Sequence, residues 1–520
     1  MVKYNSSAFV DLKRFVILQV GLTSLWCDRE GTKLINRVAE ETLKQKTAKG
    51  LFWGGMSNGV QQLLGVVFGI ILLKNLTPGD YGMVGMLAIF TGIAGTLLES
   101  GFTAALTNRP EFKDEDYNSV FWFNVIVGVT IYIILYFCAP LIAKFFHQPA
   151  LVLLSRVLFL CILFNALVVA HNAVLFKKLM VKERAIADMS GTVISGIVGI
   201  YLAIHGYGYW ALALQSLLYI FIAVVVRCFY APWHPTFHVN FKPVKEMFRF
   251  GFKLLFANII TQIQNNIFSV LLGRFYTKID VGYYSQGTKW TSLGAQFLTG
   301  AVSGVALPVL RETVNDKERQ IQVFRKILRF IAFISFPFLF GLAFVARDFI
   351  KLINPAFLPS VPILQMYCLS SAFLPIQLLY SSIVIAYNRS GIYFISTFIY
   401  AVIQIGAAIL ILPYGIYWMA FVIVITNLIY YLSWHYLTRM CIHIHLWDMI
   451  KDIAPYFVIT LSIFALVYLI TVRINNIYWN LTAKIGLSII LYIATMIITK
   501  SAIFKEAKEF ILGRMASNIH

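Results

Sequence analysis

The sequence carries little charge, and acidic residues are particularly scarce. Charged residues make up 13% of the 520 residues, and only 23 Asp and Glu accompany 43 Lys and Arg, so the formal net charge is +20. Soluble globular proteins contain about 25% charged residues. Because hydrophobic residues also reach 59%, the composition excludes an ordinary soluble domain and indicates an integral membrane protein.

Motifs for nucleotide hydrolysis and redox chemistry are also missing. The sequence contains no GxxxxGK[ST] loop, which nucleotide-driven pumps use to hold phosphates. Its six cysteines form no CxxC pair, so neither a disulfide framework nor a redox site is predicted. The segments between the hydrophobic runs are too short for an extramembrane catalytic domain. We therefore expect no covalent catalytic site, no cofactor and no metal.

Long hydrophobic runs recur along the whole chain. A spanning helix needs about 20 apolar residues, and runs of that length alternate with short polar or Pro- and Gly-containing breaks. We predict an all-α polytopic membrane protein with about fourteen spans, at 47–73, 81–106, 119–143, 151–175, 185–204, 208–230, 249–273, 281–307, 326–346, 361–386, 391–412, 415–437, 453–472 and 478–499. The spans at 249 and 281 are the weakest, because Lys and amide residues interrupt them.

The first hydrophobic block repeats 200 residues later. Ten positions are identical at this offset, and several are polar or Gly residues that shared hydrophobicity does not explain. They are Phe52/Phe252, Asn58/Asn258, Gln62/Gln262, Phe68/Phe268, Leu72/Leu272, Thr77/Thr277, Asp80/Asp280, Gly82/Gly282, Thr91/Thr291 and Leu98/Leu298. A duplicated membrane bundle is typical of transporters.

The repeat predicts the domain organisation. We expect a six-helix lobe at 44–230, a cytoplasmic linker at 231–248, a second six-helix lobe at 249–437, and two extra helices with a cytoplasmic tail at 438–520. Tight hairpins at 206–212 and 413–420 place Gly, Tyr and Trp at the same junction of each lobe. Residues 1–43 form an N-terminal extension. Its first 37 residues are either an interfacial segment or an upstream start with translation beginning at Val38, and the second is favoured.

Basic residues collect on one side of the predicted spans. From Val38 onward, 26 Lys and Arg lie in one set of loops and 8 in the alternate set. Because basic loops stay cytoplasmic, we predict that both termini are cytoplasmic. The net positive charge then reflects this bias and attraction to anionic lipids. No nucleic-acid partner is expected, because no soluble domain organises the basic residues.

Several segments together resemble a known family. They are 49–53, 76–82, 99–109, 119–124, 206–212 and 273–284, and they are similar to bacterial lipopolysaccharide and polysaccharide flippases of the Wzx type, within the multidrug/oligosaccharidyl-lipid/polysaccharide exporter superfamily. The resemblance implies the bacterial inner membrane as location. It also implies an undecaprenyl-diphosphate-linked oligosaccharide as substrate, moved from the cytoplasmic to the periplasmic leaflet. Membrane lipids and other polysaccharide-assembly membrane proteins are the partners it suggests.

Ionisable residues within spans are costly and are therefore candidates for function. Lys253 and Lys289 lie in the seventh and eighth predicted spans and could contact a diphosphate from either side of a central cavity. Arg156 is a third candidate. The alternative for all three is snorkelling, in which the charged head reaches the interface and contacts no substrate.

Polar and acidic residues in the spans form a second group of candidates. Gln262 and Asn266 are expected either to bind sugar hydroxyls or to hydrogen-bond between helices. Glu99 and Asp188 are expected to form structural ion pairs with Arg109 or a neighbouring Lys, to gate the cytoplasmic side, or to bind a coupling ion.

The predicted function is that of a flippase working by alternating access between the two lobes. Coupling to the membrane potential, to H⁺ or to Na⁺ stays open. A multidrug or cation extruder of the same superfamily is the main alternative, although it would need an acidic cavity. A polytopic glycan polymerase or ligase is a further alternative, although it would need a large outer loop.

Overall fold

The structure is a computed structural model that describes residues 53, 56–99, 114–237, 242–304, 306–501 and 503–506, with only the backbone described for 242–254 and 390. Fourteen helices within these residues are long and apolar enough to cross a membrane. The predicted all-α polytopic fold is therefore confirmed, including the two weakest spans. The predictions for residues 1–43 and for Arg109 lie outside the described residues.

The helices follow one another with short connections. After a first spanning helix, Met56–Asn75, come α3 (Pro78–Glu99), α5 (Asp114–Phe145), α6 (Leu151–Leu158), α7 (Leu160–Lys177), α8 (Val181–Ile204), α9 (Tyr209–Tyr230), α10 (Lys242–Phe275), α11 (Lys278–Ser303), α12 (Ala306–Glu312), α13 (Lys317–Ile353), η1 (Pro355–Ser360), α14 (Val361–Ser371), α15 (Leu374–Ala386), α16 (Ser390–Ile411), η2 (Leu412–Tyr414), α17 (Ile416–Arg439), α18 (Leu446–Thr471) and α19 (Ile477–Ile498).

The repeated residues Thr77/Asp80 and Thr277/Asp280 start equivalent helices in the same way. The Asp80 carboxylate accepts hydrogen bonds from the backbone N–H and hydroxyl of Thr77, and the Thr77 hydroxyl accepts one from the Asp80 backbone N–H. Thr277 and Asp280 form the same capping box at α11. Reciprocal capping satisfies donors that a helix start otherwise leaves open. The 200-residue repeat therefore duplicates real local structure.

Both predicted hairpins are present and depend on glycine. Gly206, Gly208 and Gly415 have φ angles of 80°, 54° and 102°, which side chains rarely adopt. Gly208 and Gly415 each stand directly before a helix, α9 and α17. The chain thus reverses at equivalent places in the two repeats.

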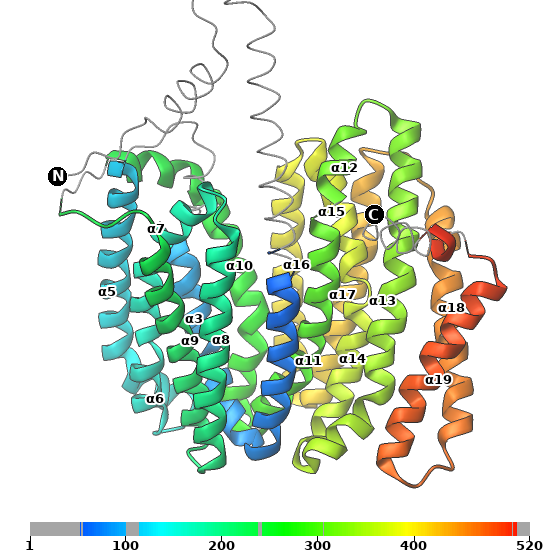
Figure 1. Cartoon of the computed structure of the whole chain (residues 1–520), viewed down its shortest axis with the longest axis horizontal. Helices are drawn as coiled ribbons and strands as arrows, with labels where there is room; N and C mark the ends of the chain where they lie inside the picture. Colours follow the sequence, from blue (N-terminus) through cyan, green and yellow to red (C-terminus); the bar gives the residue numbers. More distant parts are fainter. Residues whose placement is uncertain are drawn as a thin grey trace, which may run out of the picture.

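The helices form two groups that stand side by side, the first with α3 and α5–α9 and the second with α11–α19 (Figure 1). The first spanning helix and α10 lie between the groups and contact both of them. Leu72 and Leu73 of the first helix share a core with Ala203 of α8 and Ile350 of α13. In the same way, α10 packs on α3, α5, α11 and α16. The first helix of each repeat therefore crosses the boundary between the sequence-defined lobes.

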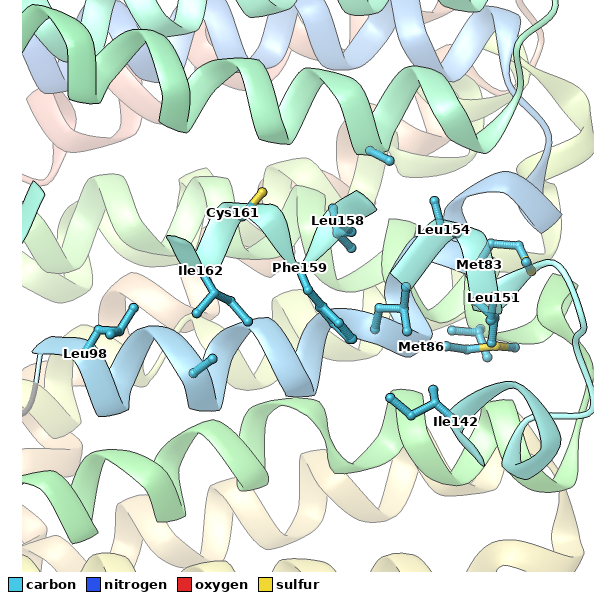
Figure 2. Close-up of a cluster of buried hydrophobic side chains, with 14 of the residues drawn as sticks. Met83, Met86, Leu98, Ile142, Leu151, Leu154, Leu158, Phe159, Cys161 and Ile162 are labelled. Carbon is cyan, nitrogen blue, oxygen red and sulfur yellow. The ribbon is translucent and has the colours of Figure 1, made fainter. Parts of the chain in front are cut away.

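A buried apolar cluster fills the first group (Figure 2) and extends to α11, α14 and α17 of the second. Phe159, at the junction of α6 and α7, is fully buried among side chains that include Met83 and Met86 of α3 and Ile142 of α5. Gly128 of α5 also lies against Ala166 of α7, and an added Cβ there would come within 2.6 Å of the Ala166 Cβ. Small residues allow such close helix packing in membranes.

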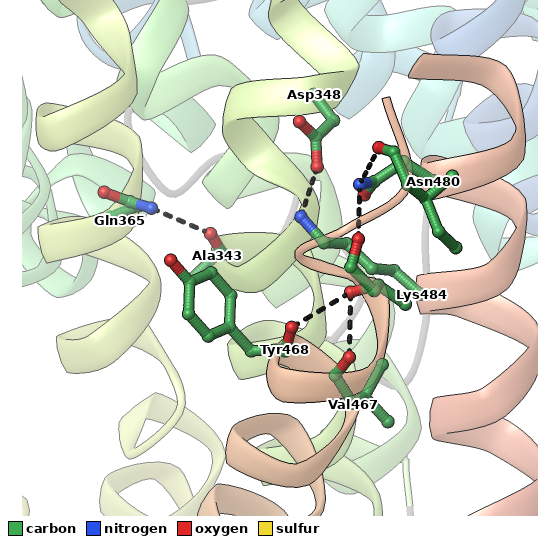
Figure 3. A network of polar contacts seen from close by, with 9 residues as sticks. Ala343, Asp348, Gln365, Val467, Tyr468, Asn480 and Lys484 are labelled. Atoms are coloured by element: carbon green, nitrogen blue, oxygen red, sulfur yellow. Dashed lines mark hydrogen bonds and ion pairs between the residues drawn. The ribbon is translucent and has the colours of Figure 1, made fainter. Parts of the chain in front are cut away.

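The two C-terminal helices, α18 and α19, pack on α13 at one edge of the molecule (Figure 1). Ion pairs join them near both ends of α13. Asp452 of α18 accepts from Arg325 Nε at 2.6 Å and from Arg329 Nε at 2.7 Å. At the other end, Lys484 Nζ of α19 donates to Asp348 Oδ2 of α13 at 2.5 Å (Figure 3). These contacts attach the appended helices to the second group.

The Asp348–Lys484 pair gives a prediction about stability. Replacing Lys484 by Met should lower the thermal unfolding midpoint clearly, because it leaves a mostly buried Asp348 carboxylate unpaired, at a cost of about 3–5 kcal/mol. Replacing both residues, Asp348→Leu with Lys484→Met, should recover most of the loss. Lys326→Met is the matched control, because its pair with Glu506 is exposed and should change the midpoint little. Equal midpoints for Lys484→Met and Lys326→Met would contradict the prediction.

Candidate functional site

Helices α3 and α11 touch at their first turns, where the two repeats meet. A Cβ added to Gly82 would lie 1.7 Å from the Lys278 carbonyl oxygen, and one added to Gly282 would lie 1.8 Å from the Pro78 carbonyl oxygen. Gly82 and Gly282 are 200 residues apart, and so are Pro78 and Lys278, so the contact is symmetric between the repeats. Only glycine allows two backbones to approach this closely.

The two helices diverge away from this contact. At Gly85 an added Cβ would still meet Ser285 Oγ at 2.6 Å, whereas at Gly95 of α3 and Gly300 of α11 no described atom lies within 4 Å. We call the end with Gly82 and Gly282 the closed end, and the end where α3 and α11 finish the open end. Among the described residues, the close contact between α3 and α11 therefore lies at the closed end.

A polar cavity of about 410 Å³ lies between the repeats, lined by α3, α9, α10 and α11. Most of its polar lining residues carry amides or hydroxyls: Tyr81, Gln215, Ser216, Asn265, Asn266, Ser269, Tyr284, Ser285, Gln286, Thr288 and Ser292. Among the described residues that line it, Lys289 is the only charged one, and none is a carboxylate. The described lining is thus mostly neutral and polar, with one basic side chain.

Lys289 points toward helices of the other repeat. Its Nζ lies 5.6 Å from the centroid of the Tyr81 ring on α3, and an added Cβ at Gly69 of the first helix would lie 3.8 Å from it. The ammonium is therefore held inside the bundle, over an aromatic face that favours a cation. The Lys289 side chain therefore does not snorkel to the interface.

The sequence matches a known protein family over much of its length. Residues 71–362, which cover more than half of the chain, match the family described as polysaccharide biosynthesis protein. The chain belongs to the polysaccharide biosynthesis protein family. The predicted resemblance to polysaccharide flippases is therefore confirmed at the level of the family.

Proteins with similar sequences come from several bacteria. The teichuronic acid biosynthesis protein TuaB of Bacillus subtilis (strain 168) is 24% identical over 359 residues, which is 68% of this chain and 74% of TuaB. The lipopolysaccharide biosynthesis protein WzxC of Escherichia coli (strain K12) is 23% identical over 63% of this chain and 67% of WzxC.

Among solved structures, the lipid II flippase MurJ in an inward closed conformation has a similar fold. The TM-score is 0.72 at 18% sequence identity, over 86% of this chain and 99% of MurJ. At this identity the similarity concerns the fold alone. This polysaccharide biosynthesis protein thus shares a helix arrangement that spans nearly all of MurJ.

Of the predicted amides in this family member, Asn266 lines the cavity but Gln262 does not. Gln262 Oε1 lies against Gly92 of α3, where an added Cβ would come within 2.8 Å. Asn266 Nδ2 donates to the Gln262 carbonyl oxygen at 2.9 Å. Gln262 therefore sits in a helix contact, one turn from a residue that faces the cavity.

The predicted candidates Arg156 and Asp188 lie away from the cavity. Arg156 of α6 stacks on Tyr136 of α5, with its Cζ 4.2 Å from the ring centroid. Asp188 of α8 forms an ion pair with Arg227 of α9, and both side chains are mostly buried. Its partner is thus an arginine on the adjacent helix, whereas the sequence suggested Arg109 or a lysine.

Of the remaining candidates, Glu99 is the one whose side chain the structure describes. Glu99 is the last residue of α3, and it is exposed. Lys253 belongs to α10, but its side chain lies outside the described residues, as does all of Arg109. The structure therefore brings together Lys289 and Asn266 among the sequence candidates.

Several cavity residues were not predicted, notably Tyr81, Gln215 and Gln286. A signal for part of the set is present in the sequence. Ser285, Lys289 and Ser292 recur at helical spacing within one span, which marks a polar helix face. No comparable signal marks Tyr81 or Gln215, because single polar residues in a span do not reveal which neighbour they face.

Residues 55–59 match the GxSxG pattern found around catalytic serines, but the local structure differs. A nucleophile elbow requires a sharp turn from a strand into a helix. Ser57 instead lies within a helix, and its Oγ accepts a hydrogen bond from Gln61 Nε2 at 2.9 Å. The pattern therefore gives no support to a hydrolase.

Proposed function

We propose that this protein is a flippase that moves an undecaprenyl-diphosphate-linked oligosaccharide from the cytoplasmic to the periplasmic leaflet of the bacterial inner membrane. The observation that carries the proposal is the cavity between the repeats, in which Lys289 is the only charged side chain among the described lining residues. A diphosphate entering a site of low dielectric needs a cation. The same site would repel a cationic drug.

The other lining residues suit the sugars of such a cargo. Asn265, Asn266 and Gln215 offer both donors and acceptors, and serine and threonine hydroxyls surround them. Sugar hydroxyls pair with groups of this kind and need no fixed charge. The cavity therefore combines one cation for the diphosphate with neutral polar groups for the glycan.

The charge bias and the closed end support the proposed direction of movement. Arg227, Lys317 and Arg439 belong to the basic loop set that is predicted to be cytoplasmic, and they lie at the same end of the bundle as Glu99. The open end would then face the cytoplasm, so that cargo enters there. Opening the contact between Gly82 and Gly282 would release the cargo on the periplasmic side.

The names of the similar proteins support this substrate class. MurJ is named as a lipid II flippase, and TuaB and WzxC are named for teichuronic acid and lipopolysaccharide biosynthesis. A transporter that serves glycan assembly with other membrane proteins is consistent with all three. The multidrug extruder is less well supported, since that function favours an acidic cavity.

We further propose that the membrane potential, acting on the anionic cargo, supplies the driving force. Asp188, Asp348 and Asp452 lie within spans, and each is bound to a basic side chain. A proton or Na⁺ could bind to any of them only after the ion pair had broken. The potential, negative inside, favours outward movement of a diphosphate by about 2.3 kcal/mol per charge for each 100 mV.

A deletion strain tests the proposed function. Loss of the gene should remove surface glycan and leave complete lipid-linked repeat units in the cytoplasmic leaflet, where added glycosidase cannot reach them in intact cells. The wild-type gene should restore both. Unchanged surface glycan in the deletion strain, with no retained repeat units, would refute the flippase function.

A further inference from the structure

Two deeply buried polar side chains of the cavity make no hydrogen bond of normal geometry with any residue that the structure describes. Gln286 is 1% exposed, and neither its Nε2 nor its Oε1 is hydrogen-bonded. Tyr81 is 6% exposed, and its hydroxyl is also without a partner. Buried polar groups are nearly always paired with protein or with ordered water, so an unpaired set that lines a cavity is a place where a polar ligand can bind.

These two groups converge with Lys289. Gln286 and Lys289 are three residues apart on α11 and therefore share a helix face. The Tyr81 ring lies beneath the Lys289 ammonium, on the facing helix. All three residues line the cavity, and no carboxylate lines it among the described residues. The site thus offers three kinds of donor and one positive charge.

The repeat shows that the helix scaffold does not require these residues. Gly82 and Gly282 and the Thr–Asp caps occur in both copies, whereas Tyr81, Gln286 and Lys289 correspond to Val281, Met86 and Ile89. The equivalent positions in the other repeat therefore carry apolar side chains. A polar cluster that occurs in only one copy fits a single bound ligand.

We propose that Tyr81, Gln286 and Lys289 form the subsite for one phosphate group of the lipid diphosphate, an inference that rests on the proposed flippase function. Phosphate oxygens accept hydrogen bonds from the ammonium, the amide N–H and the phenol, and bonds to a charged acceptor are the stronger kind. Tyr81 directly precedes Gly82 on α3, and the other two residues lie on α11. A bound phosphate would therefore bridge the repeats beside the closed end.

Binding measurements with purified full-length protein test the subsite. The probes are undecaprenyl diphosphate and undecaprenol, which share a tail and differ in the phosphates. Tyr81→Phe and Gln286→Leu should each weaken diphosphate binding about tenfold, because each loses a hydrogen bond to a charged group. Binding of undecaprenol should not change. Tyr132→Phe is the matched control, since its hydroxyl contacts the Arg156 carbonyl oxygen outside the cavity.

A charge variant tests whether misfolding, and not the loss of the subsite, explains weaker diphosphate binding. Gln286→Glu places a carboxylate beside Lys289, where the two can pair, so the protein should keep its thermal midpoint and yet lose diphosphate binding at least tenfold. Wild-type binding by Tyr81→Phe, Gln286→Leu and Gln286→Glu, with binding lost in Lys289→Ala, would overturn the subsite and leave the proposed function standing. Equal binding of both probes by the wild-type protein would instead refute the proposed function.

Discussion

Replacing Gly82 by alanine is expected to abolish glycan export. The added Cβ would lie 1.7 Å from the backbone carbonyl oxygen of Lys278, and no side-chain movement can relieve a clash with backbone. Helices α3 and α11 would have to separate, which removes the seal at the closed end. Gly282→Ala should have the same effect, because its Cβ would meet the Pro78 carbonyl oxygen at 1.8 Å.

Surface glycan in a complemented deletion strain measures the effect. Gly95→Ala and Gly300→Ala are the matched controls on the same two helices, because no described atom lies within 4 Å of an added Cβ at either position. Both should export glycan at nearly the wild-type level. All four proteins should be present in the membrane in similar amounts. Normal export by Gly82→Ala would show that the contact at the closed end is not needed in the transport cycle.

Removing the Lys289 ammonium should have the second-largest effect. Lys289→Ala leaves the cavity without a charged side chain among its described lining residues, so the diphosphate would lose its only cationic partner there. Truncating one member of a buried charge pair typically costs about 2–5 kcal/mol, which predicts a fall in export of about thirtyfold or more. Lys289→Arg should keep part of the activity, because it keeps the charge but not the shape.

The control for Lys289 is a lysine of similar chemistry outside the cavity. Lys451 lies 5.8 Å from the centroid of the exposed Trp447 ring, and Lys451→Ala should export glycan normally. Export and retained lipid-linked repeat units should be measured in the same cells. If Lys289→Ala exports as well as Lys451→Ala does, the cation is not part of the substrate site.

The sequence predicted the spans, the repeat and the hairpins because each depends on local information. Hydrophobic length determines whether a helix can cross a membrane. The Thr77–Asp80 and Thr277–Asp280 pairs mark equivalent helix starts. The family could be inferred as well, because its motifs are local. The position of α10 between the two groups could not be predicted, since it depends on contacts with α3, α5 and α16.

The lining of the cavity could be predicted only in part, because hydropathy does not fix the rotation of a helix. Asn266 and Gln262 are one turn apart, and yet only Asn266 lines the cavity. Arg156 and Lys289 both lie well within spans, but one stacks on Tyr136 of its own group and the other reaches Tyr81 of the opposite repeat. Direction within the bundle is set by packing against neighbours, and one sequence does not contain it.

The pairing of Asp188 shows the same limit. A carboxylate inside a span predicts a basic partner on energetic grounds. Arg227 is 39 residues away in the sequence, and it becomes the partner only because α8 and α9 pack closely along their length. The chemistry of the pair was predictable, but the identity of the partner required the fold.

The most direct test of the account is a structure of the protein with undecaprenyl diphosphate bound. We predict density for the diphosphate inside the cavity, within hydrogen-bond distance of Lys289 Nζ and between α3 and α11. Diphosphate density on the outer surface of the bundle, with the cavity around Lys289 filled only by water, would contradict the proposal that the cargo passes between the two repeats.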